Sequence, residues 1–190
     1  MMSEPDHRHL FADDGPVEFI SEMLWLGLAL VALIFIRPIW QRGLAACALA
    51  AACYAREANW HKQFTDDESV LKPAFFLDFQ DVGIVPKLIA GAAILVLIWS
   101  VVVVSIACWQ RASRDGWLRA SWVQTAAIGL ITLAFTKGVD RAPGIITNIR
   151  EVDMEYPLRG VLYALEEGLE VLLPIIFILA IITAPRSRGK

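Results

Sequence analysis

The sequence lacks the motifs by which many enzymes and nucleic-acid-binding domains are identified. It contains no Gly-rich phosphate loop, no Gly-x-Ser-x-Gly elbow and no Cys-x-x-Cys pair. No run of basic residues suggests a nucleic-acid partner. Histidine is scarce, and His7 and His9 lie in a polar amino-terminal tail, so a bis-histidine haem site is excluded and no haem is expected. No catalytic residue is therefore assigned.

Cysteine and charge are also sparse. Cys47, Cys53 and Cys108 lie within or beside apolar stretches, where cysteine acts as a small hydrophobic residue rather than as part of a disulfide framework. Charged residues make up 19% of the 190 residues and hydrophobic residues 57%. The mean hydropathy of +0.55 is too high for an ordinary soluble domain. The composition indicates a membrane protein.

Five stretches are candidates for membrane-spanning helices, because a helix needs about 20 apolar residues to cross a hydrocarbon core of about 30 Å. Four stretches meet this length clearly, and the Ala-rich one at residues 43–60 is weaker. We retain it as a span because the loop charges otherwise fall on inconsistent sides of the membrane. The sequence predicts an all-α, polytopic transmembrane helical bundle, a single domain at residues 19–184 with spans at residues 19–36, 43–60, 86–109, 117–136 and 160–183.

The distribution of basic residues predicts the orientation of the chain. Residues 1–18 form an acidic polar tail, unlike a cleavable signal, which needs a basic start and an apolar middle. Short cytoplasmic loops are rich in Lys and Arg. With the amino terminus outside, eight of the 17 basic residues but one of the 20 acidic residues lie on the inner side. We expect the carboxyl terminus, with its basic tail at residues 185–190, to be cytoplasmic in a bacterial-type inner membrane.

Two predicted outer connections and a set of tryptophans complete the organisation. Residues 61–85 contain three phenylalanines within residues 75–79, flanked by acidic residues, and suit a segment lying in the membrane interface. Residues 138–159 form a second outer connection of mixed charge, in which the last helix can begin early. Tryptophans lie towards the predicted cytoplasmic ends of the helices, as in an aromatic belt. They are Trp40, Trp109, Trp117 and Trp122.

Ionisable residues within the predicted spans or at their outer ends mark the candidate site, because such residues are costly in a membrane and usually functional. All of them fall in the outer half of their helices. Glu57 and His61 are four residues apart and share a helix face, as do Glu166 and Glu170. Carboxylates at reduced dielectric must be protonated, paired with a base or bound to a cation. The candidate ligand- or ion-binding residues are Glu22, Glu57, His61, Lys137, Asp140, Glu166 and Glu170.

Three functions are compatible with this pattern. In the first, the carboxylate and histidine cluster opens outwards and binds a cation, a proton or a small polar ligand. In the second, one divalent metal ion serves a membrane enzyme that acts on a lipid-borne substrate. In the third, the charges pair internally or with partner membrane subunits, and the protein is an accessory or assembly subunit of a larger complex. The metal ligands in the second reading would be Glu57, His61, Glu166 and Glu170.

Simpler interpretations apply to some of these residues. Lys137 and Asp140, three residues apart, can form an ordinary surface ion pair. Glu22 and Glu170 are the strongest candidates, because both have apolar neighbours on either side. Pro174 follows Glu170 by four residues and would release the Glu170 carbonyl from its helix bond, which would make it available as a further ligand.

Overall fold

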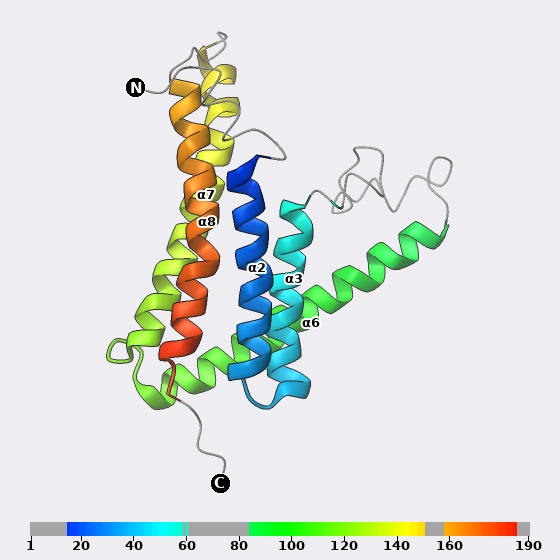
Figure 1. The fold of residues 1–190 in the computed structure, drawn as a ribbon, viewed down its shortest axis with the longest axis vertical. Helices are drawn as coiled ribbons and strands as arrows, with labels where there is room; N and C mark the ends of the chain where they lie inside the picture. Colours follow the sequence, from blue (N-terminus) through cyan, green and yellow to red (C-terminus); the bar gives the residue numbers. More distant parts are fainter. Residues whose placement is uncertain (1–14, 59, 61–83, 151–157, 186–190) are drawn as a thin grey trace. The chain divides into compact units, whose positions relative to one another are not determined.

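The computed structural model is all-helical over the residues it describes, which confirms the predicted all-α class for that part of the chain. Five α-helices and one short π-helix are present there (Figure 1). They are α2 (Pro16–Phe35), η1 (Ile39–Gly43), α3 (Leu44–Glu57), α6 (Ile84–Asp115), α7 (Ser121–Arg150) and α8 (Leu158–Thr183). The described residues are 15–58, 60, 84–150 and 158–185.

Several predicted segments therefore lie outside the described part of the chain. These are most of the amino-terminal tail, almost all of the interfacial connection and nearly the whole basic carboxyl-terminal tail. His61 belongs to the same group.

Three helices are long and apolar enough to cross a membrane, namely α2, α6 and the Ser121–Ile146 part of α7. α8 does not meet this criterion, because every 18-residue stretch of it contains Glu166, Glu167 and Glu170. α3 has 14 residues. At a rise of 1.5 Å per residue it would extend about 21 Å, less than the hydrocarbon core of about 30 Å. The spans at residues 43–60 and 160–183 remain predictions.

The described helices fall into two compact units, and α2 contributes to both. One unit contains residues 16–24 of α2 together with Asp115, the last residue of α6, and with α7 and α8. The other contains residues 25–35 of α2 together with η1, α3 and residues 84–114 of α6. The two units are described separately below.

α7 and α8 pack side by side in antiparallel directions (Figure 1). Gly129, early in α7, faces Phe177, late in α8, while Lys137 lies opposite Glu170. A Cβ atom on Gly129 would lie 2.8 Å from Cε1 of Phe177, so the missing side chain allows the helices to approach closely. The buried side chains of this unit include Trp122, Thr136, Val139, Leu173 and Ile176.

α7 corrects the predicted end of the fourth helix at Thr136. The helix continues to Arg150, so residues 138–150, predicted to belong to an outer connection, are helical. Two glycines and Pro143 in this segment favour a loop by local propensity. Val139 is nevertheless buried, and Lys137 pairs with Glu170 of α8. These tertiary contacts explain why local propensity is overridden here.

The turn between α6 and α7 corrects a second boundary, because residues 117–120 were predicted to be helical. Gly116 ends α6 with a φ of 90°, a left-handed conformation that favours glycine. The Gly116 carbonyl accepts hydrogen bonds from the N–H groups of Arg119 and Ala120 at 3.2 and 3.1 Å. α7 then begins at Ser121.

Trp122 differs from the other tryptophans of the predicted belt. It is 6% exposed, and its Nε1 donates a hydrogen bond to Oδ2 of Asp115 at 3.0 Å. Trp40, Trp109 and Trp117 are 83%, 65% and 45% exposed. Trp122 therefore joins the end of α6 to the start of α7, whereas the other three remain available to an interface.

We expect Trp122→Phe to lower the free energy of unfolding by about 1–2 kcal/mol, because it removes a buried aromatic donor to a charged acceptor. Unfolding with sodium dodecyl sulfate in mixed micelles would measure this change. Trp40→Phe is the matched control, since Trp40 is largely exposed, and its effect should stay within about 0.5 kcal/mol. Equal losses in both variants would show that the Trp122 hydrogen bond contributes nothing specific.

In the other unit, η1 runs directly into α3 and also bonds to α6. Arg42 donates from Nη2 to Oε1 of Gln110 at 3.2 Å. The buried residues of α6 are small, namely Ala90, Ser100 and Ala112. Most of its large apolar side chains are exposed.

Candidate functional site

Four of the candidate residues converge on the interface between α7 and α8. Lys137 and Asp140 are three residues apart on α7, and Glu166 and Glu170 are four apart on α8. Residues at these spacings share one helix face. Antiparallel packing brings the two faces opposite each other. We call these four residues the α7–α8 cluster.

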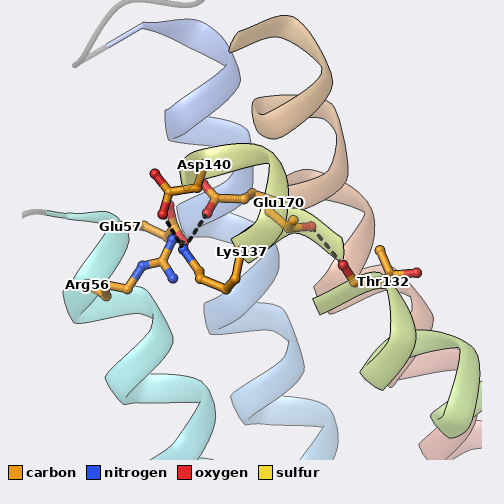
Figure 2. A network of polar contacts seen from close by, with 7 residues as sticks. Arg56, Glu57, Thr132, Lys137, Asp140 and Glu170 are labelled. Carbon is orange, nitrogen blue, oxygen red and sulfur yellow. Dashed lines mark hydrogen bonds and ion pairs between the residues drawn. The ribbon is translucent and has the colours of Figure 1, made fainter. Parts of the chain in front are cut away.

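Lys137 links the two helices. Its Nζ lies 3.3 Å from Oδ2 of Asp140 and 3.7 Å from Oε1 of Glu170. Figure 2 shows the Lys137 side chain extending towards both carboxylates. The Glu170 side chain is 9% exposed, while those of Lys137 and Asp140 are 38% and 45% exposed. The cluster therefore extends from a solvent-accessible edge to a buried carboxylate.

Glu166 adds a third carboxyl group. It is half-buried, and it interacts electrostatically with Asp140, Glu170 and Lys137. When all four side chains are ionised, the cluster contains three negative charges and one positive charge, and a carboxylate of this kind can also accept a proton or bind a cation.

Backbone features surround the cluster on both helices. Thr136 is fully buried, and its Oγ1 donates to the carbonyl of Thr132 at 2.9 Å (Figure 2). Pro174 lies inside α8, as the sequence indicated, and has no N–H to donate to the carbonyl of Glu170 four residues earlier. In α7, Pro143 likewise has no N–H to donate to the carbonyl of Val139, four residues earlier. Each helix therefore lacks one regular backbone bond next to the cluster.

The remaining predicted site residues lie on other elements of the chain. Glu57 of α3 pairs with its neighbour Arg56, whose Nη2 lies 3.4 Å from Oε1 of Glu57 (Figure 2). Glu22 is half-buried on α2, beside the buried Ser21. His61 lies outside the described residues, so the predicted Glu57–His61 pair remains a prediction.

Arg56 is the residue that the candidate set omitted. Its signal in the sequence is simple, because a base directly precedes the acid. The i, i+4 criterion favoured His61 instead, since adjacent residues on a helix point in different directions. Long side chains can still meet across that angle, as Arg56 and Glu57 do.

The predicted metal site combines residues from different parts of the chain. Among the residues that the structure describes, no group of three or more His, Cys, Asp or Glu side chains is arranged to hold a metal ion. The predicted set includes His61, which is outside that part. Metal ligation by Glu57, His61, Glu166 and Glu170 therefore stays a prediction.

The chemistry available at the α7–α8 cluster is electrostatic. It can hold a proton between carboxyl groups, bind a cation in competition with Lys137, or remain a closed ion-pair network. Comparison of the chain with protein-family models, with curated proteins and with solved structures finds no match.

Proposed function

We propose that the α7–α8 cluster is a binding site for a proton or a small cation in a polytopic membrane protein. The observation that supports this proposal is that Asp140 of α7 and Glu170 of α8 both contact the Lys137 ammonium, with Glu166 close enough to interact electrostatically with all three. Because the Glu170 side chain is 9% exposed, excess negative charge at its position is costly unless it is compensated.

The proposal places the cluster in a membrane. Three helices have the length and composition to cross one. We propose that α3 and α8 cross it as well, giving five spans in a bacterial-type inner membrane with the amino terminus outside. In this orientation the cluster lies nearer the outer side, and the basic residues at the other ends of the helices lie in the cytoplasm.

Partial exposure favours exchange with solvent over a closed network. Lys137 and Asp140 are both more than one-third exposed. At the outer side of the membrane, this edge of the cluster would be open to water and ions. A flexible lysine side chain can move away from Glu170 when another cation arrives. Lys137 would then act as a tethered counter-ion that holds the site in the absence of a ligand.

Ligand-dependent stability tests the proposed function. The full-length protein would be unfolded in mixed micelles containing sodium, potassium, magnesium or calcium chloride, with N-methylglucamine chloride as the reference. A cation at about one hundred times its Kd should raise the free energy of unfolding by about 2.7 kcal/mol. A bound proton would instead appear as greater stability at lower pH, because the folded cluster would take up a proton that the unfolded chain releases.

Matched variants identify the site. Asp140→Asn and Glu170→Gln should abolish the cation or pH response, because each removes a carboxylate that contacts Lys137. Glu167→Gln is the control, since it makes the same change on the neighbouring residue of α8, and it should retain the response. A wild-type protein whose stability is indifferent to all four cations and to pH would contradict the proposal and favour a purely structural cluster.

A further inference from the structure

A second polar group lies in the other unit, where η1 meets α6. Arg42 of η1 donates from Nη2 to the side-chain Oε1 of Gln110 at 3.2 Å. Arg114 of α6 donates from Nε to the backbone carbonyl of Gln110 at 3.1 Å. Two guanidinium groups from separate elements are therefore attached to one neutral residue. We call Arg42, Gln110 and Arg114 the Gln110 site.

The charges at the Gln110 site are not balanced by carboxylates. Within the part of the chain that the structure describes, neither Arg42 nor Arg114 forms an ion pair with an acidic side chain. Each guanidinium has several N–H donors, and its bond to Gln110 uses one of them. An anion with several oxygens would accept hydrogen bonds from the others.

Helix capping explains the position of Arg114 in the last turn of α6, but it does not explain the position of Arg42. A basic residue at a helix carboxyl end is favoured by the helix dipole and by the terminal carbonyls. This explains the bond from Arg114 to its own helix. It does not explain Arg42, which reaches Gln110 from η1.

The surroundings of the Gln110 site are typical of a membrane interface. Trp40, two residues before Arg42, is 83% exposed, and Trp109, next to Gln110, is 65% exposed. Ile106, one turn earlier in α6, is 52% exposed. Exposed tryptophans concentrate at the level of lipid headgroups, where one edge of the ring is solvated and the body is apolar. A ligand at this place would meet both positive charge and apolar surface.

We infer that Arg42 and Arg114 bind the phosphate of an anionic phospholipid at the Gln110 site. Phosphate oxygens match the fork geometry of a guanidinium, and two arginines can hold one phosphodiester from two sides. The exposed tryptophans and isoleucine favour a lipid over a free phosphate ion, because a lipid also supplies acyl chains to cover them. This site is separate in sequence and in chemistry from the α7–α8 cluster.

Quenching of tryptophan fluorescence tests the inference in the full-length protein. The protein would be placed in phosphatidylcholine nanodiscs that contain increasing fractions of brominated phosphatidylglycerol or, in a parallel series, brominated phosphatidylcholine. We expect phosphatidylglycerol to bind about tenfold more tightly than phosphatidylcholine, as suits charge-assisted hydrogen bonds. Arg42→Gln/Arg114→Gln should remove most of this preference. Arg119→Gln, the control at an exposed arginine outside the site, should leave it within about twofold.

Further arms keep the outcome decisive. Equal quenching by the two lipids in the wild-type protein would overturn the inference, and so would an unchanged preference in the double glutamine variant. Displacement of phosphatidylglycerol by inorganic phosphate would assign the site to a free anion and overturn the lipid assignment. If the double glutamine variant does not fold, Arg42→Lys/Arg114→Lys retains both charges but not the forked donors, and it should lose several-fold of the preference. No loss in the folded lysine variant would overturn the inference as well.

Discussion

Replacing Lys137 with methionine is expected to lower the free energy of unfolding by about 2–4 kcal/mol. The change removes the ammonium that contacts both Asp140 and Glu170, and it leaves three carboxyl groups close together. Breaking a fully buried ion pair typically costs about 3–5 kcal/mol. Lys137 is 38% exposed, so solvent screening should reduce the loss. Reversible unfolding in mixed micelles would measure it.

Two further variants separate this effect from a general loss of charge. Arg141→Met removes a positive charge from an exposed position on the same helix, and we expect a change within about 0.5 kcal/mol. The double variant Lys137→Met/Glu170→Gln should recover at least about 1 kcal/mol relative to Lys137→Met, because it also removes the buried carboxylate that Lys137 contacts. No recovery, or an equal loss in Arg141→Met, would contradict the assigned role of Lys137.

Replacing Gly129 with valine should destabilise the protein by about 2–3 kcal/mol. A Cβ atom at this position already lies 2.8 Å from Cε1 of Phe177 and 3.2 Å from Cγ2 of Ile176. The two further methyl groups of valine would have to displace both side chains or separate α7 from α8. Since the same interface holds the α7–α8 cluster, we also expect a weaker cation or pH response in this variant.

Gly138→Val provides the matched control on the same helix. A Cβ atom on Gly138 meets no atom within 4 Å, so valine should be accommodated there and should gain some helix propensity over glycine. Combining Gly129→Val with Phe177→Ala should recover part of the loss if the ring is the obstacle. Similar destabilisation by valine at both glycines would show that close packing at Gly129 is not the cause.

Helix positions followed well from hydropathy where the apolar runs were long. α2 was predicted at residues 19–36 and is found at Pro16–Phe35. The last helix was predicted at residues 160–183 and is found at Leu158–Thr183. Long apolar runs leave few alternatives to a helix, because a helix satisfies its own backbone hydrogen bonds.

The end of α7 could not be predicted in the same way. Local signals around Pro143 favour a loop, and the helix persists because α8 packs along α7 and pairs with it through Lys137. The π-helical segment η1 was also missed. Hydropathy predicts neither the end of α7 nor the π-helical segment, because both depend on which helices pack against each other.

The candidate site was predicted in part. Charged side chains are costly to place in a membrane, and this criterion identified four residues of the cluster. Helical spacing placed Lys137 with Asp140 on one helix face and Glu166 with Glu170 on another. Which faces meet is set by tertiary packing, and the sequence alone could not establish that α7 lies against α8. Glu57 contacts Arg56, and the Glu57–His61 pair that the spacing favoured remains a prediction because His61 lies outside the described residues.

Infrared difference spectroscopy of the protein in lipid tests the proposed binding site most directly. Spectra would be recorded on exchanging N-methylglucamine for sodium, potassium, magnesium or calcium, and separately on lowering the pH. Carboxyl stretching bands report directly whether an acidic side chain gains a proton or binds a cation. We expect at least one exchange to give a carboxyl difference band that is lost in Glu170→Gln and retained in Glu167→Gln. Identical difference spectra in the wild-type protein and in Glu170→Gln would contradict a binding site at the α7–α8 cluster.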